Sequence, residues 1–246
     1  MLISPLRLSH KPGPPQYGDN KEPVIRLRLG KKHVYRVFSG GDKSFSLGGR
    51  FYGAWWIGCP GELRKYITIQ GEQTVELDYS GIHIHLLYAL EGINYAAEND
   101  YPYNLICKLP DKDPDVELNK LILLTALNAE NETKARDSVF DQLRKDKKLE
   151  KYNITDKKPI TNKLTLLKEK HSRIAKYIAS GEGLKLQYYD ACVIEKLIQY
   201  AIRSNIPILT VHDSVICETK NTDLIRDKMH QYFTALVSGH RSFVVA

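Results

Sequence analysis

Apolar and polar positions alternate in three parts of the chain, a pattern typical of half-buried strands. Residues 24–38, VIRLRLGKKHVYRVF, predict one or two strands with a basic face. Residues 67–80, ITIQGEQTVELDYS, predict two short strands around a turn at Gly71–Glu72. Residues 205–220, NIPILTVHDSVICETK, predict a strand, a turn at the His-Asp step and a second strand.

Helical spacing of apolar residues marks five further stretches, which are 81–90, 113–129, about 164–179, about 184–204 and 222–237. Asp113 is expected to cap the second of these helices, with Pro114 in its first turn. The glycine- and aromatic-rich residues 40–56 are expected to form a loop, and the proline-rich residues 1–24 an arm or linker. The order strand, helix, helical insert, hairpin, helix predicts an α+β domain on an antiparallel sheet.

Composition narrows the function classes. Hydrophobic residues make up 42% of the 246 residues and charged residues 26%, an ordinary globular balance. No apolar run approaches the roughly 18–20 residues of a membrane span, and no signal peptide is visible. The four cysteines form no CxxC pair, which argues against a disulfide framework or a structural zinc site. A net charge of +7 favours a polyanionic partner, most often nucleic acid.

Two aspartates lie where strands are expected to end. Asp78 follows the apolar strand TVEL, and Asp213 stands at the tip of the hairpin between ILTV and VICE. Brought together by a sheet, two such carboxylates can hold two divalent ions for phosphoryl chemistry. The structural alternatives are a helix cap for Asp78 and a turn residue for Asp213.

The segments around both aspartates resemble a known family. LDYSGIHIHLLYA, 77–89, is similar to motif A of the family A polymerases, the superfamily of DNA polymerase I and single-subunit RNA polymerases. VHDS, 211–214, is similar to motif C, and KLILLTALNA, 120–129, to motif B. Residues 48–80 resemble the stretch from the family's T-G-R loop into motif A, and 185–202 the helix before motif C. The resemblance covers about 45–220.

The resemblance implies a polymerase palm with a helical fingers region inserted into it and a thumb that is absent or minimal. The arm would comprise 1–24, the palm 25–90 and 184–246, and the fingers-like insert 91–183. Asp78, Asp213 and the backbone carbonyl of Tyr79 would hold two Mg²⁺ ions, with Mn²⁺ as an alternative. Such a protein would be a DNA-directed nucleotidyltransferase that adds nucleotides to a primer 3′ end.

Further site residues follow from the same resemblance. Lys120 would meet the nucleoside triphosphate, and His212 would lie beside the metal site. Asn128 and His83 would line the nucleotide pocket. The nucleic-acid contacts would come from Arg50, Arg64 and Gln187. The expected partners are a DNA primer-template or single-stranded nucleic acid and a protein that replaces the thumb or clamp, with no membrane. The expected setting is the cytoplasm, in a bacterial, phage or mobile-element context.

Departures from the family pattern keep alternatives open. His83 occupies the position where DNA polymerases of the family usually carry a sugar-excluding glutamate, so an RNA-synthesising or primase-like enzyme with weak sugar discrimination is one alternative. Asn128 stands where the family has a tyrosine. A hydrolase built on His212-Asp213 is a second alternative, although Ser214 lacks the G-x-S-x-G turn. A non-catalytic nucleic-acid-binding palm is the third.

Overall fold

The computed structural model describes residues 16–17, 23–24, 27–40, 44–98, 100–105, 113–237 and 244–245. Within these ranges the chain is a mixed α+β protein with antiparallel sheets, which confirms the predicted class. The predicted arm, 1–24, lies outside the described residues apart from the paired strands β1, Gln16–Tyr17, and β2, Pro23–Val24.

The chain divides into two compact units. The first comprises Met1–Ser80, Tyr188–Leu236 and Ser242–Ala246, and the second Gly81–Gln187 and Val237–Arg241. The first unit is therefore discontinuous in sequence. Helix 82–90, expected within the first palm segment, groups with the second unit.

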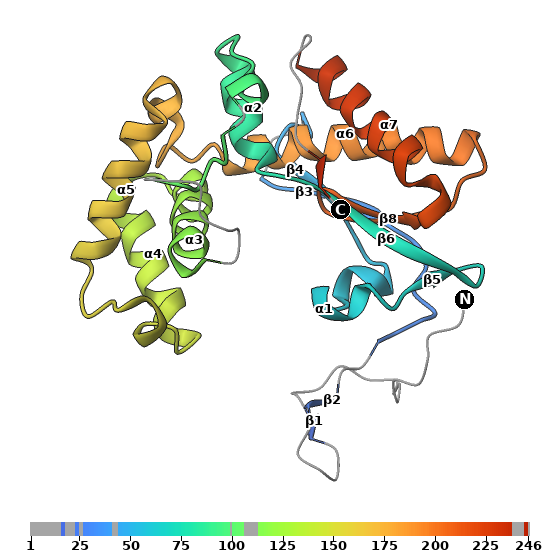
Figure 1. Ribbon diagram of the computed structural model, residues 1–246, viewed down its shortest axis with the longest axis horizontal. Helices are drawn as coiled ribbons and strands as arrows, with labels where there is room; N and C mark the ends of the chain where they lie inside the picture. The colour runs from blue at the N-terminus through green and yellow to red at the C-terminus, as the bar shows by residue number, and fades with distance from the viewer. Residues whose placement is uncertain are drawn as a thin grey trace. The chain divides into compact units, whose positions relative to one another are not determined.

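The main sheet of the first unit has the order β5-β6-β8-β7, and β9 also pairs with β6 (Figure 1). The strands are β5, Thr68–Ile69; β6, Glu72–Tyr79; β7, Ile208–Val211; β8, Ser214–Glu218; and β9, Val244–Val245. Every pairing is antiparallel. Both predicted hairpins are confirmed, and the first turns at Gln70–Gly71, one residue before the predicted step.

Alternation along the strands builds two buried faces on this sheet. Leu77 and Val215 face helix α7, Thr222–Leu236, which buries Met229 and Phe233 completely. The opposite face carries Val211, which packs with the tryptophans of the 3₁₀ helix η1, Trp55–Gly58. A short helix, α1, Gly61–Arg64, follows η1, and another 3₁₀ turn, η5, Thr219–Asn221, precedes α7.

A second, two-stranded sheet consists of β3, Tyr35–Phe38, and β4, Gly48–Tyr52. The prediction of a loop over 40–56 is therefore wrong at β4. Glycine makes the ribbon possible, because a Cβ on Gly49 would lie 2.8 Å from the Phe38 ring and one on Gly53 2.4 Å from the Tyr35 ring.

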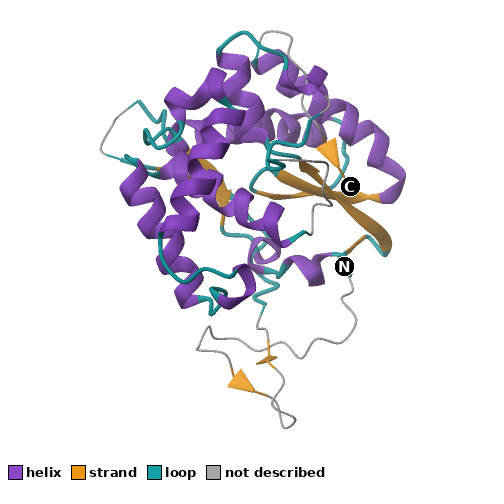
Figure 2. Ribbon diagram, turned by 60° about the vertical axis from the view of Figure 1, so that its left-hand side comes forward, coloured by secondary structure: helices purple, strands orange, loops and turns teal. Residues whose placement is uncertain are grey.

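The second unit is helical (Figure 2). Its helices are α2, Ile82–Leu90; α3, Pro114–Asn128; α4, Glu132–Lys145; α5, Lys158–Lys170; and the first turn of α6, Gly183–Arg203, which continues into the first unit. Its 3₁₀ helices are η2, Tyr95–Glu98; η3, Glu150–Tyr152; and η4, Ser172–Tyr177. The predicted cap is confirmed, since Asp113 accepts a hydrogen bond from the Asp115 amide at 2.8 Å.

Two helices of this unit differ from expectation. Helix α4 was not predicted, and Asn131 caps it by accepting from the Lys134 amide at 2.9 Å. The helix expected over 164–179 begins earlier and ends at Lys170. The next residue, His171, is fully buried and its ring contacts Tyr88 and Pro102 through hydrogen bonds, so a tertiary contact ends the helix there.

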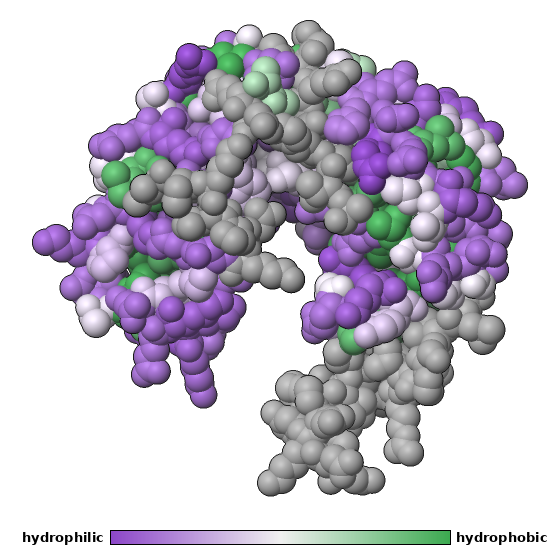
Figure 3. Space-filling view, viewed as in Figure 1, coloured by the Kyte–Doolittle hydropathy of each residue, from purple (hydrophilic) through white to green (hydrophobic). Residues whose placement is uncertain are grey.

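The lysine-rich residues 131–176 are largely neutralised by neighbouring acids. Ion pairs join Lys151 to Glu117 (2.5 Å), Lys163 to Asp115 (2.6 Å) and Lys168 to Glu132. Hydrophilic residues cover most of the face of this unit drawn in Figure 3. The paired lysines thus form a salt-bridged helical surface. None of the helices in the described ranges combines the length and apolar character that a bilayer crossing requires.

Candidate functional site

Asp78 and Asp213 are brought together by the pairing of β6 with β8. Asp78 lies directly opposite Ser214 in this ladder, and Asp213 is the residue before Ser214. Directly opposite residues of an antiparallel pair have Cβ atoms about 4.5–5.5 Å apart. Both aspartates are partly exposed, and the charge of Asp213 reaches the end of β6, where it helps burial to raise the pKa of Tyr79. The register therefore places the two aspartates at neighbouring positions of the ladder.

The Asp213 carboxylate is presented by a two-residue turn between Val211 and Ser214, which pair with one another. The first residue of the turn, His212, has φ +55°. Two-residue hairpins favour turns with positive φ at this position, and glycine usually occupies it. A histidine there carries backbone strain of about 1 kcal/mol, which points to a requirement for its side chain.

The His212 ring is half-buried beside β4. It meets the Tyr52 ring edge-on, with centroids 5.4 Å apart. Its Nδ1 atom is buried and has no hydrogen-bond partner among the described residues. Burial, followed by the positive charge of Arg50, lowers the pKa of His212. The lowered pKa favours the neutral form of the ring, whose Nδ1 is available as a hydrogen-bonding group.

Arg50 links β4 to α6. Its Nε donates to both carboxylate oxygens of Asp190, at 3.2 and 3.1 Å, and its Nη2 donates to Asp190 Oδ2. The same Nη2 lies 4.0 Å from Asp213 Oδ1. Burial alone would lower the pKa of Arg50, but the hydrogen bonds and charge of Asp190, with the charge of Asp213, raise it. Arg50 is thus held within the protein rather than extended into solvent.

Asp190 was not predicted from the sequence as a residue of the site. Its side chain is completely buried, and it lies one or more helical turns from the buried Leu186, Ile194 and Leu197 on the same face of α6. A single acidic residue on the apolar face of an amphipathic helix was the signal that could have found it, because a buried carboxylate requires a partner.

The side chains of Arg64 and Tyr79 form hydrogen bonds within the first unit. Arg64 Nε donates to Glu76 Oε2 at 2.8 Å, and Ser214 Oγ donates to the other oxygen of that carboxylate at 2.6 Å. The Tyr79 side chain is buried and donates to the Met229 carbonyl at 2.7 Å. The network at Glu76 ties α1, β6 and β8 together next to the aspartates.

The four remaining predicted residues belong to the second unit, whereas both aspartates belong to the first. Lys120 is exposed on α3, and its Nζ lies 5.6 Å from the centroid of the Tyr103 ring. Asn128 donates to the Leu124 carbonyl at 2.8 Å, and His83 is buried on α2. Gln187 is the last residue of this unit's main segment and lies on α6.

The donor set suits a hard cation. In the part of the chain that the structure describes, no three or more His, Cys, Asp or Glu side chains converge as metal ligands. Asp78 and Asp213 would supply two carboxylates and leave the other positions to water and phosphate oxygens. Magnesium is bound in this way, by few protein carboxylates, which makes the pair compatible with the ion that the family resemblance implies.

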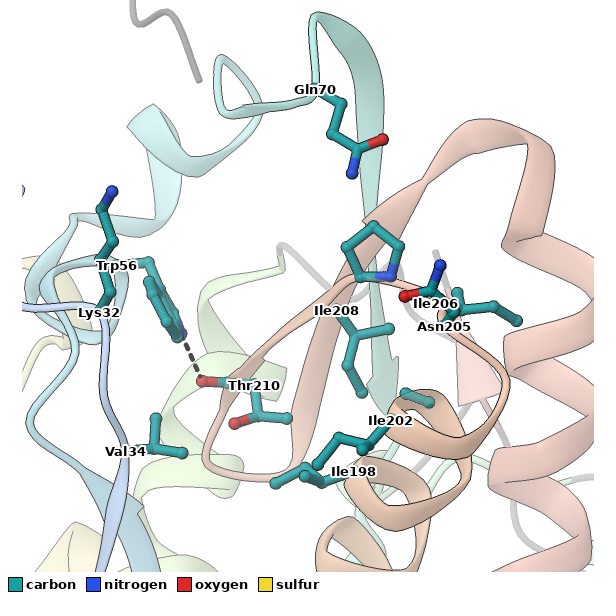
Figure 4. A pocket seen from close by; sticks show the side chains of 12 residues that line it. Lys32, Val34, Trp56, Gln70, Ile198, Ile202, Asn205, Ile206, Ile208 and Thr210 are labelled. Atoms are coloured by element: carbon teal, nitrogen blue, oxygen red, sulfur yellow. Dashed lines mark hydrogen bonds between the residues drawn. The ribbon is translucent and has the colours of Figure 1, made fainter.

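A separate pocket of about 420 Å³ lies beside β7 in the first unit (Figure 4). Trp56 forms one wall and donates from Nε1 to the Thr210 carbonyl at 3.0 Å. Ile198 and Ile202 of α6 and Ile208 form the opposite side. Neither aspartate lines this pocket, so we assign it no part in the chemistry.

The sequence was compared with protein families and with curated proteins. No protein-family model matches the sequence, and no curated protein matches it. The identification of the site therefore depends on the motifs and on the positions of Asp78, Asp213, His212 and Arg50.

Proposed function

We propose that this protein is a nucleotidyltransferase that adds nucleotides to the 3′ end of a nucleic-acid primer, most simply by DNA-templated DNA synthesis. The first unit would act as a polymerase palm and the second as an inserted fingers-like region. The observation that carries the proposal is the register of β6 and β8, which puts Asp78 opposite the residue that follows Asp213.

Asp78 and Asp213 would bind the divalent ions, with the Tyr79 carbonyl as a third ligand. When bound, two magnesium ions would lower the pKa of the primer 3′-hydroxyl and neutralise charge on the triphosphate. His212, held by its turn and by its edge-on contact with Tyr52, would orient a hydroxyl or phosphate oxygen next to Asp213. Lys120 would stabilise the negative charge that develops on the leaving pyrophosphate.

The internal bonds of two arginines change their proposed roles. Arg50 and Arg64 were expected to contact nucleic acid, but both donate to carboxylates of the first unit. We infer that Arg50 positions Asp213, because its guanidinium is fixed by Asp190 and lies 4.0 Å from Asp213. Arg64 would support β6 through Glu76.

A primer-extension assay in magnesium tests the proposal. Wild-type protein should extend a primer, and Asp78→Asn or Asp213→Asn should lower the rate by about 100-fold or more. Asp227→Asn is the matched control, since Asp227 is exposed on α7. Absence of incorporation by wild-type protein from either nucleotide class, on several templates and without a template, would leave a non-catalytic nucleic-acid-binding palm as the better description.

A further inference from the structure

The positive charge of this protein is concentrated at one end of the sequence. Residues 1–40 contain eight Lys or Arg and two acidic residues, a surplus of +6 out of the total of +7. Within the described residues 27–40, the sequence has four basic residues, Arg28, Lys31, Lys32 and Arg36, and no Asp or Glu. The first three of these are exposed, so this charge faces solvent, unlike the ion-paired lysines of α4 and α5.

Aromatic side chains follow this charge directly. Tyr35 is 60% exposed, and it lies opposite Tyr52, which is 37% exposed. Opposite residues of an antiparallel ribbon share a face. A side chain on Gly53 would meet the Tyr35 ring at 2.4 Å, so glycine is what lets the ring lie against the ribbon. The result is a pair of accessible tyrosine rings on one face.

The same face continues to the proposed active site. Tyr52 contacts the His212 ring, and Arg50, two residues before Tyr52 on β4, lies 4.0 Å from Asp213. We call the residues Arg28, Lys31, Lys32, Tyr35 and Tyr52 the basic-aromatic strip. Its three cations are exposed and precede β3 in the sequence, and Tyr52 contacts the His212 ring of the turn that carries Asp213.

We infer that the basic-aromatic strip binds single-stranded nucleic acid, with the cations on the phosphates and the two tyrosine rings stacked on bases. Proteins that bind single strands without sequence preference combine a basic track with aromatic side chains in this way. That the bound strand delivers its end to Asp78 and Asp213 rests on the proposed function; the binding itself does not.

Fluorescence anisotropy with a labelled oligothymidylate of about 20 nucleotides tests the binding. Tyr35→Ala should weaken binding by about five-fold or more, the loss expected for one stacked base. Tyr66→Ala is the matched control, because Tyr66 is also 60% exposed and lies outside the strip. An abasic oligonucleotide of the same length should bind Tyr35→Ala and wild type equally, since it offers phosphates but no bases.

Charge reversal tests the other half of the strip. Lys31→Glu with Lys32→Glu should weaken binding to both oligonucleotides and reduce the dependence of log K on log salt. Lys196→Glu with Arg203→Glu makes the same charge change on exposed positions of α6 and should have a much smaller effect. Equal losses in the two double variants would show that only net charge matters and would overturn the inference.

Two further outcomes would overturn it. One is Tyr35→Ala binding within two-fold of wild type, which would remove the stacking role. The other is poly-glutamate competing as well as unlabelled oligonucleotide of equal charge, which would indicate an acidic protein as the partner. Asp213→Asn should bind like wild type. Strip-dependent binding without any primer extension would therefore refute the proposed function alone. Primer extension by a protein whose binding does not depend on the strip would refute the strip alone.

Discussion

Arg50 and Asp190 form an ion pair in which one guanidinium donates to both oxygens of a completely buried carboxylate. The pair joins the β3–β4 ribbon to α6, and it also fixes a cation 4.0 Å from Asp213. In the proposed site, this cation would hold the Asp213 carboxylate in position before a metal ion binds. The Arg50–Asp190 pair is thus a structural support with a direct consequence for the proposed site.

Breaking this pair should cost stability. Asp190→Asn leaves the Arg50 charge without its buried counter-ion, and we expect the free energy of unfolding to fall by about 3–5 kcal/mol. Urea denaturation measures the change. The double variant Arg50→Met with Asp190→Leu removes both charges and should recover at least half of the loss. If the double variant is less stable than Asp190→Asn, the ion pair itself contributes more than its charges cost to bury.

The strained turn should separate stability from activity. His212→Gly relieves a positive φ that glycine adopts freely, so its unfolding free energy should stay within about 1 kcal/mol of wild type. His212→Ala keeps the strain and loses the contact with Tyr52, so it should be the less stable of the two. Both variants should be slow in primer extension. A His212→Gly protein of undiminished rate would show that the side chain has no role in the reaction.

Acid should destabilise the second unit first. Burial lowers the pKa of both His85 and His171 from 6.5 to about 4, so the unfolded chain binds protons that the folded one does not. Stability should therefore be complete above pH 6.5 and fall as the pH drops from 6.5 toward 4, by on the order of 2–3 kcal/mol for each histidine. Urea denaturation at several pH values in this range measures the change. The unfolding free energy of His171→Gln should depend less steeply on pH than that of the wild type. His33→Gln, at an exposed position, should keep the wild-type slope.

Sugar selection should depend on position 83. His83 is buried on α2, where the family resemblance would place a sugar-excluding glutamate. His83→Glu should reduce the use of ribonucleotides relative to deoxynucleotides by about ten-fold or more, a typical discrimination for one steric contact. Single-nucleotide incorporation with each sugar measures the ratio. His83→Gln controls for size without charge, and an unchanged ratio in both variants would place the selectivity elsewhere.

Lys120 should matter for rate rather than for folding. It is exposed on α3, so Lys120→Ala should leave the unfolding free energy within about 0.5 kcal/mol of wild type. The proposed contact with the triphosphate predicts a loss of about 100-fold in nucleotide incorporation. Lys145→Ala, at an exposed position of α4, should keep the wild-type rate. Equal rates in the two variants would remove Lys120 from the proposed site.

The sequence predicted the elements whose signals are local. Alternation at 72–79 and 208–218 indicated the strands that carry the aspartates, and Asp113 marked the start of α3. Strand β4 was missed because its glycines suit a loop, and only its pairing with β3 shows why they are needed. The end of α5 was missed because it depends on the buried His171, whose partners lie 69 and 83 residues away.

The candidate site also contains some residues that the sequence indicates and some contacts that only the fold shows. Asp78, Asp213 and His212 could be named because motifs and turn chemistry are written in short stretches of sequence. The ion pairs of Arg50 and Arg64 could not be predicted, since their partners, Asp190 and Glu76, come from other elements. An exposed and an ion-paired arginine look alike in a sequence, and only the fold separates them.

The discontinuity of the first unit has a consequence for how the protein forms during synthesis. Strand β6 precedes the 81–187 segment, but β8, whose Ser214 pairs with Asp78, follows it. Contacts between residues so distant in sequence form slowly, whereas helices that follow one another in the second unit, such as α3 and α4, contact each other over shorter separations. On the ribosome, the main segment of the second unit should therefore fold first, and the paired aspartates should be assembled only after β8 has been made.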